Sequence, residues 1–370
     1  MSNIVSLSVY EMVHEIKKTV LKELKVNKCL RDMGSFMLWG PPGVGKSEGV
    51  FELAHELSLE TGKRVVVHDR RLFLFNPVDF MGVPIANLES GFTEWLKPQL
   101  FDMDDSSDVI NILFLDEINT ATPSVQACGY QLTWDKAVGN HKLPDNCIVI
   151  AAGNRTTDKS VVYKMPKALC GRLAHFEISS DINSWKKWAR LNGIDDRIIA
   201  YISFKNESLF DFDSNSDDVA FPSPRSWAMV SKYIEGESVE ENYNLISARV
   251  GIAIAQDFVT YVKVYKELPS IKDIIAGKDV EVPEEPDKVY ALSSQLVTEC
   301  LKCIKVSEQG MVEHIDKNRL DNLGKYIEHM PVEAGARILG ELVMIKGVAS
   351  ALLQLPRYRE WQKQLAKYIV

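Results

Sequence analysis

Residues 40–47, Gly-Pro-Pro-Gly-Val-Gly-Lys-Ser, match the pattern G-x-x-x-x-G-K-[ST] at every fixed position. This pattern indicates phosphate binding where a strand precedes it and a helix follows it. The apolar run at 35–39 is short enough for a buried strand, and Val50, Leu53 and Leu57 recur at helical spacing. The sequence therefore predicts a strand, a phosphate loop and a helix in this order. The alternative is a plain glycine-rich turn between a strand and a helix.

Each residue type in this loop has its own task. Glycines let successive backbone N–H groups curl around an anion, and the N-terminus of the next helix adds the positive end of its dipole. Lys46 can reach the β- and γ-phosphates, and the Ser47 hydroxyl can hold Mg²⁺. We therefore expect a nucleotide to be contacted by the whole loop and by the start of the helix. The predicted contacts are Gly40, Pro41, Pro42, Gly43, Val44, Gly45, Lys46, Ser47 and Glu48.

Two adjacent acids, Asp116 and Glu117, directly follow the apolar run at 112–115. An uninterrupted apolar run is typical of a parallel strand that is covered on both faces. In α/β folds, ligands bind at the carboxyl ends of such strands. We expect Asp116 to bind Mg²⁺, directly or through water, and Glu117 to polarise an attacking water. The alternative is an Asp-Glu pair that only begins a loop.

Strand patterns are confined to the first half of the chain, which predicts an α/β domain with three αβα layers and a parallel five-stranded sheet. Helical periodicity at 9–24 leads into the first strand. The irregular segment 76–98 predicts an inserted loop or a short hairpin with exposed aromatics. Gly139-Asn140 predicts the turn of a second hairpin at 137–143. The predicted strands are 35–39, 64–68, 112–115, 147–152 and 175–178.

After residue 178 the patterns are helical almost throughout. Ser223 followed by Pro224 is a typical N-cap with proline at the first helical position. We predict an α/β nucleotide-binding domain over 1–180, a helical lid over 181–274 and a C-terminal helical extension over 275–370. The longer helical patterns lie at 243–265, 288–304, 319–329 and 334–353.

The composition excludes several classes of protein. The 370 residues carry a net charge of −8, so a dominant non-specific DNA-binding surface is not expected. The six cysteines show no disulfide spacing, and Cys300 and Cys303 form a lone C-x-x-C without a second pair. A buried free thiol is expected at Cys147, and a reducing cytoplasm fits this usage best. We expect no secretory signal and no membrane span.

With these residues in view, the chain resembles the AAA+ ATPases, and within them the MoxR branch. Residues 39–47 resemble the Walker A loop of this family, and residues 112–117 resemble its Walker B strand. The hairpin at 137–143 resembles the pre-sensor-1 insertion, and segment 76–98 resembles the helix-2 insert. The resemblance covers nearly the whole α/β half and is looser in the helical half. It implies ATP hydrolysis with ATP and Mg²⁺ as ligands.

The resemblance also implies roles for residues outside these two motifs. Asn154 matches sensor 1, which hydrogen-bonds the γ-phosphate or orients the lytic water; the alternative is a residue that caps a strand. Arg172 lies where the family carries an arginine finger that reaches a neighbouring subunit. Leu173, which follows it, replaces a common phenylalanine, and Arg155 is a competing candidate for an interface contact. Arg225 matches sensor 2, and its alternative is a surface arginine near capping serines.

An arginine that acts on a neighbour's nucleotide implies a head-to-tail ring, in this family usually a hexamer. MoxR proteins typically act on protein clients, often with a von Willebrand A domain, so we expect a motor that remodels or matures such a partner. A nucleic-acid loader is a second hypothesis, which the acidic net charge disfavours. A third is a switch that binds ATP with little turnover, which the intact Asp116-Glu117 pair disfavours.

Overall fold

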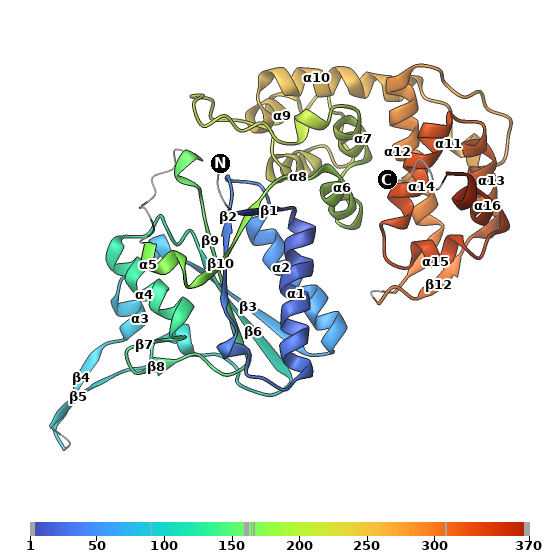
Figure 1. The fold of residues 1–370 in the computed structure, drawn as a ribbon. Coiled ribbons are helices and arrows are strands. Elements are labelled where there is room, and N and C mark those ends of the chain that lie inside the picture. Colours follow the sequence, from blue (N-terminus) through green and yellow to red (C-terminus); the bar gives the residue numbers. More distant parts are fainter. Residues whose placement is uncertain are drawn as a thin grey trace. The chain divides into compact units, whose positions relative to one another are not determined.

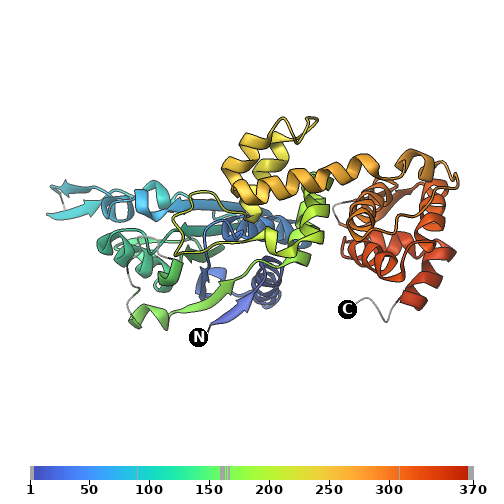
Figure 2. The ribbon, with the colours of Figure 1, turned by 90° about the horizontal axis from the view of Figure 1, so that it is seen from above.

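The chain divides into two compact units. The first comprises Met1–Ser180 with Asp213–Asp217, and the second comprises Asp181–Phe212 with Asp218–Val370. Figures 1 and 2 draw the chain from two directions, with colours that follow the sequence. Apart from Asp213–Asp217, residues 181–274 and 275–370, predicted as a lid and an extension, therefore lie within the same unit. The computed structural model describes residues 4–89, 91–158, 163, 165, 167–307 and 309–365.

The core of the first unit is a six-stranded parallel sheet with the strand order β1-β10-β2-β9-β6-β3. The α/β class and the five predicted strands are confirmed, but the predicted count of five is one too low. The additional strand, β1, has three residues, too few for a recognisable hydrophobic pattern. The strands are β1 (Val5–Leu7), β2 (Ser35–Trp39), β3 (Arg64–Arg71), β6 (Val109–Asp116), β9 (Cys147–Gly153) and β10 (Leu173–Ile178).

Helices cover both faces of this sheet, with α1 and α2 on one side and α4 on the other (Figure 1). Along β6, Leu113 and Leu115 pack into the cluster that contains Val125 of α4. Because neighbouring residues of a strand point to opposite faces, Asp116 points towards the face of α2. The helices of this unit are α1 (Val9–Lys25), α2 (Lys46–Thr61), α3 (Val78–Met81), α4 (Pro123–Trp134) and α5 (Lys167–Cys170).

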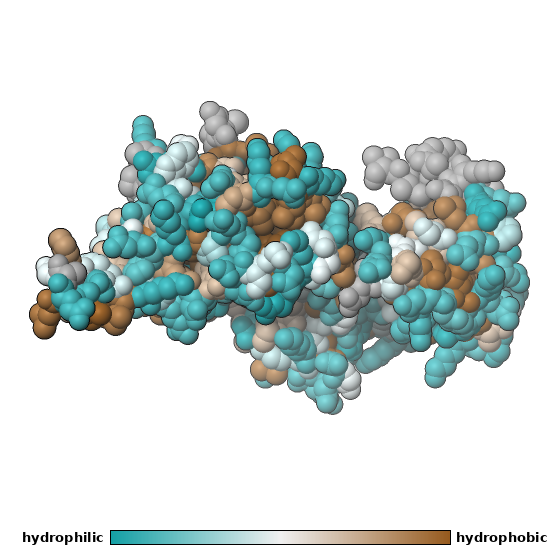
Figure 3. Space-filling model, turned by 90° about the horizontal axis from the view of Figure 1, so that it is seen from below, coloured by the Kyte–Doolittle hydropathy of each residue, from teal (hydrophilic) through white to brown (hydrophobic). Residues whose placement is uncertain are grey.

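Both predicted hairpins are present. The first consists of β4 (Pro84–Asn87) and β5 (Phe92–Trp95), and the second of β7 (Ala137–Val138) and β8 (His141–Lys142). The β4–β5 hairpin extends away from the sheet, and Figure 3 shows hydrophobic side chains at its end, on the left of the view. Leu88 is 91% exposed and Phe92 is 75% exposed. This hairpin therefore presents apolar surface to solvent.

The second unit is mainly helical, and it departs from the prediction in three places. Gly251, at φ 86°, separates α9 from α10 where one helix was predicted. Gly347, also at φ 86°, lies between α14 and α15, where the pattern at 334–353 predicted one helix. Strands β11 and β12 form an antiparallel hairpin in a region predicted as wholly helical. The elements are α6 (Ile182–Leu191), α7 (Asp196–Phe204), α8 (Pro224–Tyr233), α9 (Tyr243–Val250), α10 (Ile252–Lys263), α11 (Ile271–Ile275), α12 (Pro286–Lys302), β11 (Ile304–Val306), β12 (Val312–Ile315), α13 (Lys317–Glu328), α14 (Val332–Val343), α15 (Val348–Leu352) and α16 (Pro356–Leu365).

The cysteines are free thiols, and Cys147, Cys300 and Cys303 are buried. Burial raises the pKa of Cys300 to about 12 and that of Cys303 to about 11. Across the described residues, no group of three or more His, Cys, Asp or Glu side chains is arranged to hold a metal ion. Within the same residues, no helix combines the length and the apolar character needed to cross a bilayer.

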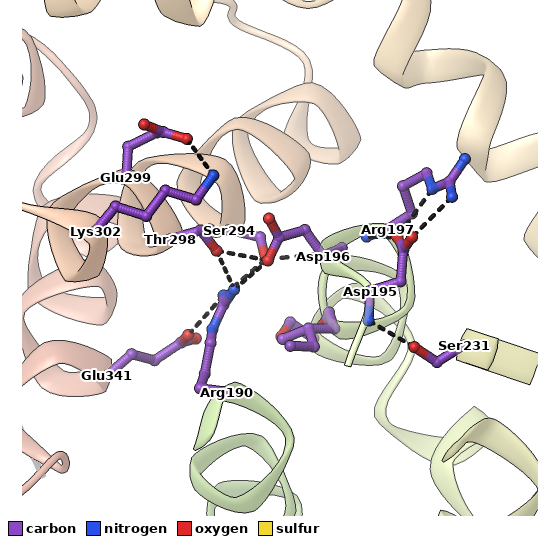
Figure 4. Close-up of polar contacts among 12 residues, drawn as sticks. Arg190, Asp195, Asp196, Arg197, Ser231, Ser294, Thr298, Glu299, Lys302 and Glu341 are labelled. Carbon is purple, nitrogen blue, oxygen red and sulfur yellow. Dashed lines mark hydrogen bonds and ion pairs between the residues drawn. The ribbon is translucent and has the colours of Figure 1, made fainter. Parts of the chain in front are cut away.

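A buried ion cluster joins the two predicted parts of the second unit (Figure 4). Arg190 of α6, whose side chain is 4% exposed, pairs with Asp196 of α7 at 2.8 Å and with Glu341 of α14 at 3.2 Å. Lys186 pairs with Glu341 at 3.0 Å. Burial alone would raise the pKa of Glu341, but the charges of Lys186 and Arg190 hold it below its ordinary value. The carboxylate therefore stays charged between two buried cations.

We expect the Glu341→Gln substitution to lower the free energy of unfolding by about 3–5 kcal/mol at pH 7, because it leaves two buried cations without compensation. The loss should shrink below pH 4.5, the ordinary pKa of the group, since the wild-type carboxyl then becomes protonated as the pH falls through its lower folded-state value. Denaturant unfolding at several pH values measures both effects.

The matched control is Glu240→Gln, whose partner Lys266 is 72% exposed. This surface pair should contribute under about 1 kcal/mol. Equal losses for the two variants at pH 7 would contradict a stabilising role for the buried cluster.

Candidate functional site

The phosphate loop leaves the carboxyl end of β2 and enters α2 at Lys46. Gly43 at φ 80° and Gly45 at φ 107° have backbone angles that side chains other than glycine rarely adopt. A Cβ atom on Gly40 would lie 2.8 Å from the Ile178 carbonyl oxygen on the neighbouring chain segment. The glycines therefore meet both the turn geometry and the close packing that this loop requires.

Lys46 links the loop to the end of the neighbouring strand. Its side-chain nitrogen Nζ donates to the Gly40 carbonyl at 2.6 Å, to the Pro41 carbonyl at 3.1 Å and to Asn154 Oδ1 at 3.2 Å. Strands β2 and β9 are adjacent, with Trp39 opposite Gly153, so Asn154 follows directly beside the loop. The predicted phosphate-binding lysine and the predicted sensor residue are thus in contact.

Ser47 and Asp116 form the second contact across the site. Ser47 Oγ donates to Asp116 Oδ2 at 3.0 Å, which joins the start of α2 to the end of β6. A hydroxyl and a carboxylate are hard oxygen donors of the kind that Mg²⁺ binds next to substrate phosphates. The residues present therefore fit the metal predicted here. Glu48, the next residue of α2, is exposed.

Glu117 has an unusual backbone. Its φ is +55°, in the left-handed region that costs a residue other than glycine about 1 kcal/mol or more. Its N–H donates to Asp116 Oδ1 at 2.9 Å, and its carbonyl accepts from the Thr120 N–H at 3.0 Å. The two acids therefore share a tight turn at the carboxyl edge of the sheet, beside the phosphate loop.

A further carboxylate, Asp69, lies near the site on β3. Its pKa is raised, first by burial and then by the charge of Asp116. Its Oδ1 atom is buried and has no hydrogen-bond partner among the residues that the structure describes. Asp69 was not singled out from the sequence, because the edge strand β3 places it here only through its register with β6.

The two candidate interface arginines have different surroundings. Arg155 is held by its own chain: it pairs with Asp158 at 2.9 Å and with Glu177 at 2.5 Å. Arg172 is exposed, and its guanidinium carbon lies 5.5 Å from the centre of the Trp134 ring. The surroundings therefore favour Arg172 as the cation that is available to a second molecule.

Arg225 belongs to the second unit, in the first turn of α8, and it is exposed. Ser223 caps this helix by accepting from the Ser226 N–H at 3.1 Å. The predicted contact of Arg225 with phosphate stays a prediction.

The sequence reasoning did not single out Asn119, which is 1% exposed and donates from Nδ2 to the Asn154 carbonyl at 2.7 Å. The available signal was a polar residue three positions after Asp116, in a segment that continues a core strand. Trp134 was also not considered, although it is 54% exposed at the end of α4.

Residues 36–180 match the family described as "ATPase family associated with various cellular activities (AAA)". No curated protein sequence matches the chain. Among solved structures, PCH-2 of C. elegans is similar at 15% identity and a TM-score of 0.35, over 72% of this chain and 71% of that one. A RuvB mutant of Thermotoga maritima is similar at 15% identity and a TM-score of 0.30, over 85% and 96%. The family match confirms the prediction of an ATPase domain.

We expect the Asp116→Asn substitution to remove the Mg²⁺-dependent part of ATP binding, because the amide carries no charge to attract the metal. The affinity for a fluorescent ATP analogue is measured with Mg²⁺ and with EDTA. The wild type should bind more tightly with Mg²⁺ than with EDTA, whereas the variant should bind equally under both conditions, so that its affinity with Mg²⁺ is lower than that of the wild type by about tenfold or more. Asp69→Asn is the matched control and should retain the Mg²⁺ dependence. Retention by Asp116→Asn would contradict the assigned role.

Proposed function

Because residues 36–180 form an ATPase domain of the AAA family, we propose that the chain is an ATP-driven motor of the MoxR branch. We propose that it assembles into a ring and remodels or matures a protein partner. The observation that carries the proposal is the convergence of Lys46, Asn154, Ser47 and Asp116, whose contacts of 3.2 Å and 3.0 Å meet at one edge of the sheet.

In this proposal each residue at this edge of the sheet has a separate role in phosphoanhydride hydrolysis. The loop amides and Lys46 bind the β- and γ-phosphates, and Asn154 orients the γ-phosphate or the attacking water. Ser47 and Asp116 would hold Mg²⁺, which would supply positive charge beside the phosphate oxygens. Glu117 accepts a hydrogen bond from the water and directs it along the line of attack.

The surroundings of Arg172 support the proposed ring. An exposed cation on the first unit can complete the site of a second copy, and head-to-tail contacts of this kind form a ring where the rotation between copies closes. We propose a hexamer, the usual form in the AAA+ superfamily, with Arg172 directed at the neighbour's γ-phosphate. Arg225 would then bring the second unit to the same nucleotide.

We expect Arg172→Ala and Glu117→Gln each to abolish ATP hydrolysis, and an equal mixture of the two to recover part of it. About a quarter of the interfaces in a random ring would join an intact Glu117 to an intact Arg172. The loss in each pure variant should be about 10³-fold, the effect of an arginine supplied by a neighbour. Steady-state ATP turnover of the mixtures measures the recovery.

Arg155→Ala mixed with Glu117→Gln serves as the comparison, because Arg155 is already paired within its own chain. Mixtures that stay inactive with Arg172→Ala, or that recover only with Arg155→Ala, would contradict the role of Arg172. Ring size, measured by mass photometry with an ATP analogue, tests the hexamer separately.

The β4–β5 hairpin is the proposed contact with the protein partner. Its exposed apolar residues, with Val83 at 54% and Leu96 at 53% in addition to Leu88 and Phe92, are of the kind found at protein interaction sites. A von Willebrand A-domain protein is the partner class that the MoxR assignment favours. The net charge of −8 disfavours a nucleic-acid partner, and stimulation of ATP turnover by DNA would contradict the proposal.

We expect the double substitution Leu88→Ser, Phe92→Ser to weaken partner binding about 100-fold, because two exposed apolar side chains would no longer be buried. The experiment uses the Glu117→Gln protein in the presence of ATP, the form expected to stay bound to its partner. The amount of partner that remains bound is measured with and without the hairpin substitutions. ATP turnover of the hairpin variant in the wild-type background should stay within about twofold. Val219→Ser, 99% exposed in the second unit, is the control. Unchanged retention would exclude the hairpin as the contact.

A further inference from the structure

The turn that carries Glu117 is fastened to the end of β9. Ile118 N–H donates to the Ala152 carbonyl at 3.0 Å, and Asn119 Nδ2 donates to the Asn154 carbonyl at 2.7 Å. These two bonds connect the segment after β6 to the segment that ends in Asn154. The distance between the Glu117 turn and the Asn154 main chain is therefore set by contacts outside the regular ladder of the sheet.

Asn119 is fixed from several sides. Gln126 Nε2 donates to the Asn119 carbonyl at 3.3 Å and to the Ala121 carbonyl at 2.9 Å. Tyr130 in turn donates to Gln126 Oε1 at 2.6 Å. This buried chain of hydrogen bonds from α4 orients the main chain at Asn119, which leaves the side-chain amide directed at β9.

The amide oxygen of Asn119 lies close to Gly153. A Cβ atom on Gly153 would lie 2.4 Å from Asn119 Oδ1 and 3.0 Å from the Met37 methyl carbon. Within the described part of the chain, Asn119 Oδ1 is buried and accepts no hydrogen bond. An unpaired buried acceptor is costly, so the position is retained at the expense of stability. Such an expense is expected where a side chain sets the geometry of a site.

From these contacts we propose that Asn119 is a positioning residue for ATP hydrolysis. It holds the Asn154 main chain at a fixed distance from the Glu117 turn. The Glu117 carboxylate, which polarises the water, and the Asn154 side chain, which senses the γ-phosphate, are thereby placed for the same reaction. In this role Asn119 acts through the main chain of Asn154 and not through a contact of its own with the nucleotide. The inference deepens the proposed function and rests on it.

A residue that only stabilises the fold would lower the amount of folded protein without changing the turnover of each folded molecule. Asn111 offers the matched comparison. It is fully buried at the other end of β6, where Nδ2 donates to the Asp104 carbonyl at 2.7 Å and to Asn146 Oδ1 at 2.9 Å. Asn111→Ala should lower the unfolding temperature and leave kcat per folded molecule unchanged.

The test compares kcat, KM for ATP and unfolding temperature for Asn119→Ala, Asn119→Asp and Asn111→Ala in the full chain. Asn119→Asp keeps the size of the side chain and removes the donor, so it remains informative where alanine weakens the fold. We expect kcat of both Asn119 variants to fall about 10- to 100-fold with KM within about twofold, since misplaced groups slow the chemical step and leave binding intact.

The Asn154→Ala background provides a second measurement. Because Asn119 acts through Asn154, adding Asn119→Ala to Asn154→Ala should lower kcat by less than about threefold. Equal losses in both backgrounds, or a kcat per folded molecule that matches Asn111→Ala, would overturn the proposal. A wild-type protein without turnover, or a Glu117→Gln variant as fast as the wild type, would overturn the proposed function and this inference with it. Turnover that needs Glu117 but tolerates both Asn119 variants would overturn the inference alone.

Discussion

The site depends on the pairing of three neighbouring parallel strands, β2, β9 and β6. Their registers place Trp39 opposite Gly153 and Leu115 opposite Ala151, so all three chains leave the sheet at one edge. The phosphate loop, Asn154 and the Asp116-Glu117 turn then meet without any long connection. A slip of one residue of β6 against β9 would turn Asp116 to the opposite face, away from Ser47.

Much of this edge was predictable, because each motif is local. The phosphate loop and the acidic pair stand at the ends of uninterrupted apolar runs, which parallel strands covered on both faces require. What a single sequence does not carry is the partner of each polar side chain. The bond from Asn119 to Asn154 and the pairing of Arg155 with Glu177 join residues 35 and 22 positions apart, which only the folded sheet brings together. The breaks at Gly251 and Gly347 were also missed, because an isolated glycine within a helical pattern can be tolerated and does not by itself mark the end of a helix.

The site also contains several features that lower the stability of the fold. Glu117 adopts a left-handed backbone, Asn119 Oδ1 and Asp69 Oδ1 are buried without hydrogen-bond partners among the described residues, and Lys46 is 9% exposed. A protein selected for stability alone would avoid each of these. Their location at the carboxyl edge of one sheet, beside the glycine loop, is what a site built for charged ligands and a positioned water is expected to show.

The surroundings of Arg155 and Arg172 bear on which of them would reach the nucleotide of a neighbouring copy in the proposed ring. Arg155 would have to leave two carboxylates before it could reach a phosphate, and each hydrogen bond to a charged group is worth about 1.5–3 kcal/mol. The guanidinium carbon of Arg172 lies 5.5 Å from the centre of the Trp134 ring at an exposed turn, and a cation–π contact leaves the charge of the guanidinium in place. A cation that is oriented by an aromatic ring and not neutralised by it suits a group that must bind a phosphate only when a neighbour presents one. The contacts of the two arginines therefore support the proposal that Arg172, and not Arg155, reaches the phosphate of a neighbouring copy.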